Sequence, residues 1–408
     1  MQMLFTQTHS KPVKRIRAGF HQATVGLLGT IILVSIGFLG ASATAEAVPA
    51  YARKHQVACS MCHSAWPLLN EAGRRFKEDG YRFDRRADPA APESGEIALE
   101  EALALALNLP MSFRVQGRPF VKRNTDSRFD MQVVHEVELQ VTDGTPGNIS
   151  YYVNFEAADD EGWATELKDV VAGWHPRAQA NIVGGYGPLT FADPYNTFAS
   201  RRLTQDRPSP NSAGFQSGYR FRDATQFGSF YGRVGGLFYN AAVGTGAGDT
   251  VGADKKDYLV RAAYDLPGGI SIGAFSLTGD KELPEPLRTQ EYSRAGADVQ
   301  VERGPFTANA VWYRADEDAA ATLVGQTNDA WYVQALYITP TKVPVVPFVR
   351  YESVESNEGA ASTDSLALAL LAYVRGNVNV SLDYTTQTKV PPGRAKTHRF
   401  SVLVIFAM

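Results

Sequence analysis

The chain has little of several features that would decide its class at once. Only two of its 408 residues are cysteine, which excludes the disulfide framework of a small secreted fold. Its 40 Lys and Arg side chains nearly balance 43 Asp and Glu, and the net charge of -3 gives no sign of a nucleic-acid partner. Beyond the N-terminal region, no apolar run reaches the length of a transmembrane helix. A mean hydropathy of -0.21 still permits a membrane barrel, because barrel strands alternate apolar and polar residues.

The N-terminal region has the layout of an export signal. Four basic residues precede an apolar stretch, 23–40, that contains no charged side chain. Residues 43–47 then hold two overlapping A-x-A triplets, the pattern that signal peptidase accepts. We predict a cleavable signal peptide over 1–47 and a mature chain that begins near Glu46 or Val48. The alternative is a retained anchor, because the apolar stretch is close to spanning length.

Both cysteines lie in one short motif, Cys59-Ser60-Met61-Cys62-His63. Cys-x-x-Cys-His is the sequence at which haem c is attached. Two thiols one turn apart can each add to a vinyl group of the haem, and the adjacent histidine can ligate the iron. We therefore predict one covalent haem on Cys59 and Cys62, with His63 as the proximal ligand. A thioredoxin-type redox pair is the alternative, but the surrounding sequence lacks its βαβ pattern.

The residues after the motif predict an amphipathic helix that packs against the haem. Apolar or small residues recur at helical spacing, at Trp66, Leu69, Ala72, Gly73 and Phe76. Charged residues occupy the positions between them, and Gly80 suits a helix C-cap. We expect Trp66 and Phe76 to pack against the porphyrin, within a small α-helical cytochrome domain at 48–83.

No motif marks the sixth ligand of the haem iron. Met111 is our predicted distal ligand, because it lies at the junction with the next domain and a thioether raises the haem potential. His55, four residues before Cys59, is an alternative that folds back over the opposite haem face. Met131 and His135 remain open as well, but either one requires the following domain to reach the haem.

From residue 108 onward the sequence predicts a transmembrane antiparallel β-barrel of about 16 strands. Segments of about ten residues alternate in polarity: in one of them Ile149, Tyr151, Val153 and Phe155 oppose Asn148, Ser150, Asn154 and Glu156. The same alternation occurs within 258–265, 294–302, 345–352 and 377–384, and in the last residues, 400–408. A soluble β-sandwich or propeller is the rival fold, because alternation alone does not distinguish lipid from a protein core.

The connections between these segments also fit a barrel. Short turns at 143–147, 267–269 and 375–377 alternate with longer polar stretches near 200–213, 244–256, 281–290 and 315–328. Outer-membrane barrels show this asymmetry, and a lumen of this size is wide enough for a plug. Residues 84–107, rich in Asp, Glu, Arg, Ala and Pro, are the expected linker.

Two pairs of acidic residues occupy strand positions that are expected to face the lumen. Glu136 with Glu138 and Asp298 with Glu302 are candidate metal carboxylates, or residues that only solvate a pore. No G-x-S-x-G nucleophile motif with partners supports a hydrolase.

Several motifs together resemble the fused monohaem cytochrome–porin family, whose best-known members are the outer-membrane iron oxidases of iron-oxidising bacteria. The resemblance lies in 49–53, 59–63, 73–77, Gly80-Tyr81 and 109–112. It implies a location in the outer membrane and an electron path from extracellular ferrous iron to the haem and on to a soluble periplasmic cytochrome. The activity would then be a ferrous iron:cytochrome c oxidoreduction. The alternative is a haem-bearing porin that conducts solute or exchanges electrons with another donor or acceptor.

Overall fold

A computed structural model describes residues 50–55, 57–83, 111–145, 147–159, 162–198, 202–246, 255–283, 288–319, 322–357, 359–375 and 378–407. The predicted signal peptide, 1–47, and the predicted linker, 84–107, lie outside these residues. Within the described ranges, no helix is both long and apolar enough to cross a membrane.

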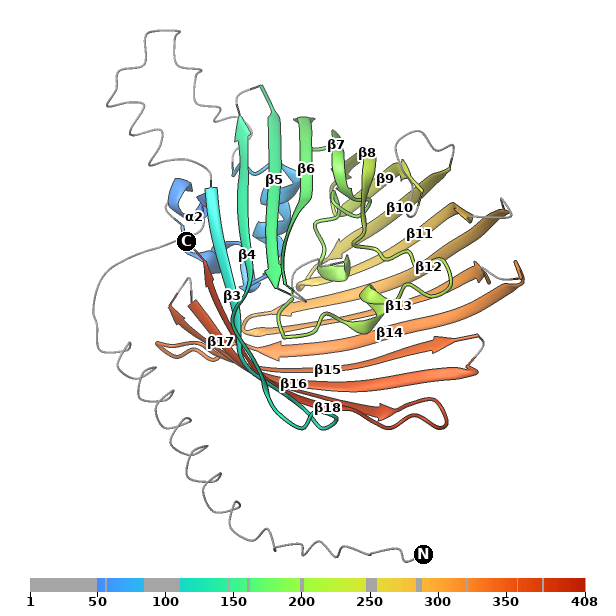
Figure 1. The fold of residues 1–408 in the computed structure, drawn as a ribbon. Coiled ribbons are helices and arrows are strands. Elements are labelled where there is room, and N and C mark those ends of the chain that lie inside the picture. The colour runs from blue at the N-terminus through green and yellow to red at the C-terminus, as the bar shows by residue number, and fades with distance from the viewer. Residues whose placement is uncertain are drawn as a thin grey trace, which may run out of the picture. The chain divides into compact units, whose positions relative to one another are not determined.

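In the described residues, 16 antiparallel strands close into one barrel (Figure 1). The first half comprises β3 (Met111–Arg123), β4 (Asp130–Thr145), β5 (Ile149–Asp159), β6 (Trp163–Arg177), β7 (Ala180–Pro188), β8 (Ala224–Val234), β9 (Leu237–Thr245) and β10 (Lys256–Leu266). The second half comprises β11 (Ile270–Leu283), β12 (Arg288–Arg303), β13 (Phe306–Asp318), β14 (Gly325–Tyr337), β15 (Val345–Ser356), β16 (Ala361–Arg375), β17 (Val378–Lys389) and β18 (His398–Ala407). Each strand pairs with the next, and β18 pairs with β3 to close the ring. The predicted strand number is confirmed, and the closed ring excludes a sandwich or a propeller.

The strands turn apolar side chains outward, as their alternation predicts. Ile149 and Phe155 on β5 are each 48% exposed, whereas Ser150 and Asn154 between them are buried. Leu382 is exposed on β17 and its neighbour Asp383 is buried. An exposed apolar band around a closed barrel is the surface that a lipid bilayer covers.

The two ends of the barrel differ in the length of their connections. At one end the strands are joined by short turns, such as 178–179, 235–236 and 304–305. At the other end the connections are longer, and the longest runs from β7 to β8. Short turns face the periplasm in barrels of this type and long loops face outward. We call the two ends the short-turn end and the long-loop end.

The connection between β7 and β8 folds into the lumen. Its described residues, 189–198 and 202–223, are here called the plug loop; they include η2 (Asn196–Phe198) and α5 (Ser209–Ser212). Leu189, Phe198 and Phe221 of this loop form one buried cluster with inward residues of the wall, among them Phe275 and Tyr313. The inner wall is apolar along these strands, where the plug loop covers it.

Residues 50–55 and 57–83, here called the N-terminal segment, lie in the barrel mouth at the short-turn end (Figure 1). The segment contains α2 (Ala50–His55), η1 (Cys59–Met61), β1 (His63–Ala65), β2 (Leu68–Leu69) and α3 (Glu71–Glu78). The main helix begins later than the spacing from Trp66 predicts, because β1 and β2 pair as a hairpin and Asn70 caps α3 by accepting a hydrogen bond from the Gly73 N–H at 2.9 Å. Gly80 follows α3 with a φ of +67°, as expected of a residue that ends a helix.

Candidate functional site

The Cys-x-x-Cys-His motif forms a tight turn that leads into the hairpin. The backbone N–H of Cys62 donates to the carbonyl of Cys59 at 3.2 Å, so the two cysteines lie one turn apart, as attachment of one haem needs. Both thiols are partly buried, and this burial raises the pKa of each. His63 follows directly as the first residue of β1.

A cavity of about 750 Å³ lies next to the motif, within the size range of small-molecule and cofactor pockets. The N-terminal segment contributes His63, Trp66, Tyr51 and Tyr81 to its lining. The plug loop and the strands β3 to β6 supply the other walls. A histidine and three aromatic rings line one cavity, and two thiols lie in the adjoining turn; this set of residues would fit a haem attached at Cys59 and Cys62.

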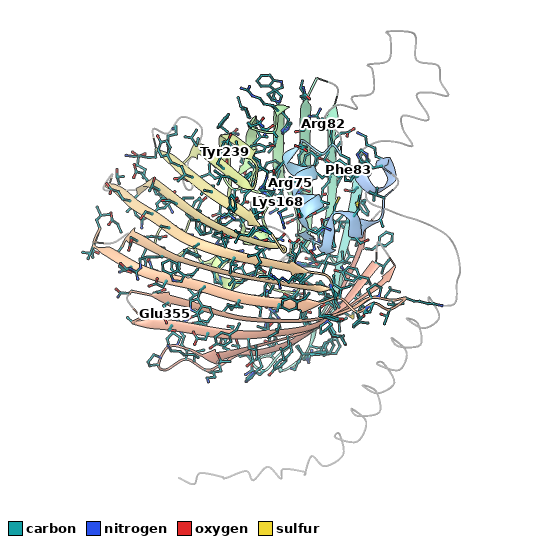
Figure 2. The ribbon with its side chains drawn as sticks, turned by 180° about the vertical axis from the view of Figure 1, so that it is seen from behind. Arg75, Arg82, Phe83, Lys168, Tyr239 and Glu355 are labelled. Atoms are coloured by element: carbon teal, nitrogen blue, oxygen red, sulfur yellow. The ribbon has the colours of Figure 1, made fainter. Side chains whose placement is uncertain are left out.

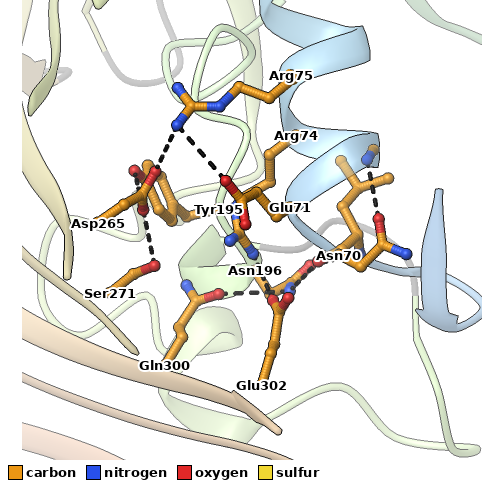
Figure 3. A network of polar contacts seen from close by, with 12 residues as sticks. Asn70, Glu71, Arg74, Arg75, Tyr195, Asn196, Asp265, Ser271, Gln300 and Glu302 are labelled. Carbon is orange, nitrogen blue, oxygen red and sulfur yellow. Dashed lines mark hydrogen bonds and ion pairs between the residues drawn. The ribbon is translucent and has the colours of Figure 1, made fainter. Parts of the chain in front are cut away.

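Ion pairs between α3 and the wall hold the N-terminal segment in the mouth (Figure 3). The buried Arg74 pairs with Glu302 of β12, and Arg75 donates to Asp265 of β10 at 3.1 Å. Both wall residues lie beside short turns. The inward position predicted for Glu302 is confirmed, and its partner is a helix arginine.

The end of α3 is fixed by a second buried pair. Arg233 of β8 donates from Nε and Nη2 to the two carboxylate oxygens of Glu78, at 2.7 and 2.6 Å. Arg233 also contacts Asp265 at 2.8 Å, which joins this pair to the contact made by Arg75. Figure 2 shows the whole molecule from the side opposite to Figure 1, with Arg75 and Arg82 labelled. The Nη1 of Arg82 donates to Asn148 at 2.8 Å.

The plug loop contacts both the N-terminal segment and the wall. The Asn196 side chain accepts from the Leu69 N–H at 2.9 Å and donates to the Leu69 carbonyl at 3.0 Å, as a neighbouring strand would. Lys77 of α3 donates to the Asp193 carbonyl at 2.7 Å, and burial lowers the pKa of this lysine to about 8. The Asp193 carboxylate pairs with Arg261, which also pairs with Asp298, at 2.7 and 2.6 Å.

The structure places the candidate distal ligands in different surroundings. Met111 is the first residue of β3 and is 36% exposed. Its side chain lies on the opposite face of the strand from Ser112 and Arg114, which line the cavity. His55 lies against Phe76 at 5.6 Å between ring centroids, and its buried Nε2 has no hydrogen-bond partner among the described residues.

The two remaining candidates belong to β4. Met131 is exposed on the outer surface. His135 lines the same cavity as His63, and its Nδ1 lies 3.1 Å from the Asp159 carbonyl. The Met111 assignment stays a prediction.

The predicted pair Glu136 and Glu138 is joined by Glu156, and these carboxylates converge within 4.8 Å. Arg114 bridges Glu136 and Glu138, Arg202 reaches Glu136 at 2.8 Å, and Lys168 reaches Glu156 at 3.3 Å. The three carboxylates thus have basic partners in this structure, and Lys168 also contacts Glu166 at 2.5 Å.

Sequence reasoning missed the plug loop as part of the site. The signal for it is an unusual number of aromatic residues in a connection: Phe191, Tyr195, Phe198, Phe215, Tyr219 and Phe221. Exposed loops seldom carry so many large apolar side chains, because those side chains need a core to cover them.

Comparison with protein-family models gives no match, and no curated protein matches the chain. Among solved structures, the chain is similar to the anion-selective porin from Comamonas acidovorans, with a TM-score of 0.57 and 10% identity over 73% of this chain and 98% of that one. It is similar to OmpT of Vibrio cholerae in its trimer form, with a TM-score of 0.55 and 11% identity over 73% and 98%. It is also similar to Salmonella typhi OmpF in complex with daunomycin, with a TM-score of 0.54 and 14% identity over 74% and 97%.

At these identities the likeness shows the fold, which is a closed 16-stranded barrel of the outer-membrane porin type. The site within it is a Cys-x-x-Cys-His turn beside a cavity in the barrel mouth.

Proposed function

We propose that this protein is an outer-membrane electron-transfer conduit with one covalent haem c, which takes electrons from extracellular ferrous iron and passes them to a soluble periplasmic cytochrome. The observation that carries the proposal is the position of the Cys-x-x-Cys-His turn. It lies inside a porin-type barrel, and buried ion pairs from α3 to the wall fix it there. When bound, the haem would supply the one-electron redox chemistry.

The residues of the chain have separate roles in this proposal. Cys59 and Cys62 would hold the haem, and His63 would ligate its iron. Glu78 and Arg233 would keep the turn formed by residues 59–63 at a fixed place in the mouth. The rate of electron transfer depends steeply on distance, so a fixed haem gives a fixed rate to each partner.

The orientation of the barrel supports the direction of electron flow. The N-terminal segment occupies the short-turn end, which faces the periplasm in barrels of this type. A periplasmic cytochrome would therefore approach the haem from that side. Ferrous iron would approach from the long-loop end, where ferric products stay outside the cell.

The plug loop favours electron transfer over passage of solute. Its aromatic side chains fill the lumen next to the inner wall from β6 to β14, as shown by the buried cluster around Phe221 and Tyr313. A passive porin needs an open lumen, whereas electrons can cross a packed interior over a limited distance. The second candidate, a haem-bearing porin, is favoured by the likeness to solved porins and by the polar cavity beside β3 to β6.

One preparation of proteoliposomes tests both functions. The purified protein is reconstituted around an entrapped soluble cytochrome c and a small fluorescent solute, and ferrous iron is added outside. We expect internal cytochrome c to become reduced without release of the solute, and a His63→Ala variant to lose the reduction. Release of the solute without reduction would favour the porin function instead.

A further inference from the structure

The lumen has two unlike sides. From β6 to β14 the inner wall packs against aromatic side chains of the plug loop in one buried cluster, which includes Phe221 and Tyr313. From β3 to β6 the wall instead lines the cavity of about 750 Å³, together with the N-terminal segment and the plug loop. The described residues thus leave space for a small solute beside β3 to β6.

This cavity runs along the strands. On β5, every second residue from Tyr152 to Ala158 lines it. A strand rises about 3.3 Å per residue, so these positions cover about 20 Å. Tyr152 pairs with Thr142 near the turn from β4 to β5, whereas Ala158 is the last residue but one of β5. The cavity therefore extends from the short-turn end towards the long-loop end.

The cavity is open to solvent at the long-loop end. Among the residues that line it, Glu166 of β6 and Arg220 of the plug loop are exposed, and the others are buried or partly buried. Glu166 pairs with Glu156 near the start of β6, and Arg220 comes shortly before β8 begins at Ala224. Both exposed side chains therefore belong to the long-loop end, where solvent enters.

The N-terminal segment closes the opposite end of the cavity. The hydroxyl groups of Tyr51 and Thr142 form a hydrogen bond of 2.5 Å, and Lys54 pairs with Asp143 one residue further along β4. Ala50 and Thr142, which line this part of the cavity, are buried. Within the described ranges, the cavity is therefore blind at the short-turn end.

The lining is polar and carries charges of both signs. It includes seven carboxylates and eight lysine or arginine side chains, so the opposite charges nearly balance. Such a lining favours water and has no large excess of charge that would repel a cation. An ion that keeps its water shell in this space avoids the free-energy cost of losing it.

We propose that this cavity is a blind access channel, through which a small hydrated electron donor passes from the long-loop end to the turn formed by residues 59–63. His63 of that turn lines the same cavity. The channel rests on the cavity alone, whereas ferrous iron as its donor rests on the proposed function. In that function one electron passes, from ferrous iron that becomes ferric to ferric haem iron that becomes ferrous, and no proton or bond moves. Because the short-turn end is closed, the ferric product leaves by the way it entered and stays outside the cell.

The first measurement does not depend on the haem. Gln140→Cys places a thiol on the cavity lining, opposite Asn154 and about midway between Thr142 and Ala158. The detergent-solubilised holoprotein is treated with a small cationic methanethiosulfonate or with a maleimide carried on a long polyethylene glycol chain. Mass spectrometry of the peptides then gives the rate at which this thiol is modified.

Bulky substitutions near the open end test the direction of entry. Ala158→Trp narrows the cavity there, and Ala224→Trp is a second blocking variant from β8. Ala157→Trp is the matched control, because neighbouring residues of a strand point to opposite faces and this one points outward. All variants are first checked for heat-modifiable migration, which reports a closed barrel.

We expect the small reagent to modify the thiol of Gln140→Cys and the large reagent to leave it unmodified. Ala158→Trp or Ala224→Trp should slow the modification by about tenfold or more, which equals an added barrier of about 1.4 kcal/mol. Ala157→Trp should leave the rate near that of Gln140→Cys alone.

The second measurement is stopped-flow reduction of the haem in the same blocking and control variants without Gln140→Cys. Ala158→Trp should slow reduction by ferrous iron by a similar factor. Electron exchange with soluble cytochrome c should stay near the parental rate, because that partner approaches from the short-turn end in the proposed function.

Equal modification rates in the blocking variants and in Ala157→Trp would overturn the channel, as would a thiol in Gln140→Cys that the small reagent does not modify. Slower modification with unchanged reduction by ferrous iron would overturn the channel as the route of the donor. Reaction of Cys59 and Cys62 with the small reagent in the parent would show that they carry no haem. That result would overturn the proposed function, and modification of Gln140→Cys would still decide on the channel.

Discussion

Replacing Glu78 with Gln tests whether buried ion pairs hold the Cys-x-x-Cys-His turn in the barrel. Glu78 accepts two hydrogen bonds from Arg233, and both side chains are less than one-tenth exposed. The substitution keeps the size and shape of the side chain but removes its charge. Among the described residues, Arg233 then retains Asp265 as its charged partner.

Breaking a buried ion pair on one side costs about 3–5 kcal/mol. Since Gln still accepts a hydrogen bond and Asp265 still neutralises Arg233, we expect about 2–3 kcal/mol here. That loss applies to the free energy that separates the docked N-terminal segment from an undocked one. At about 1.4 kcal/mol for each factor of ten, undocking becomes about 30 to 140 times more frequent.

Hydrogen exchange of the α3 amides measures this change, because their protection reflects the docked population. Glu71→Gln is the matched control on the same helix. Glu71 is mostly exposed and lies 3.8 Å from Arg75, a surface pair worth about 0–1 kcal/mol. We expect faster exchange over 71–83 in Glu78→Gln and near-parental exchange in Glu71→Gln. Equal exchange in the two variants would refute the role given to the buried pair.

Four further predictions concern the haem attachment, the distal ligand, the pH and the barrel. Cys59→Ala or Cys62→Ala should abolish or shift the c-type spectrum, and His63→Ala should shift it; a normal spectrum in all three would contradict haem attachment. Met111→Ala should remove a sulfur-to-iron charge-transfer band and lower the potential; if both persist, His55→Ala is tested next. The pKa of Lys77 is lowered from 10.5 to about 8 when docked, so the docked segment gains stability as pH rises from about 8 to 10.5, and hydrogen exchange of α3 should show this gain disappearing in Lys77→Met. The barrel should resist extraction by salt and migrate faster on gels before boiling, whereas full release by salt would contradict a membrane barrel.

The barrel was predictable because its signal is local. Alternation along each strand, as at Ile149 and Ser150, follows from the period of two in a β-strand, and it fixes which side chain points inward. Strand number and the inward position of Glu302 follow from the same pattern. The Cys-x-x-Cys-His motif is equally local, because five adjacent residues form it, and the haem that it indicates stays a prediction.

The arrangement inside the barrel was not predictable from such patterns. Arg74 and Glu302 are 228 residues apart in sequence, and no local rule pairs them. The plug loop depends in the same way on tertiary packing, since Phe221 meets Tyr313 only after the barrel closes. The start of α3 also differs from its predicted position. The spacing of apolar residues predicts a helix from Trp66, but β1 and β2 form a hairpin there and Asn70 caps the helix.

The central claim is that a haem held at Cys59, Cys62 and His63 in the barrel mouth accepts electrons from ferrous iron. Spectroelectrochemistry of the purified protein, produced in cells that attach haem c, tests it most directly. We predict a c-type spectrum that changes from the oxidised to the reduced form when ferrous iron is added. The reduction of the haem should keep pace with its reoxidation by the soluble cytochrome acceptor. A protein without haem, or a haem that stays oxidised in excess ferrous iron while dithionite reduces it, would contradict the account.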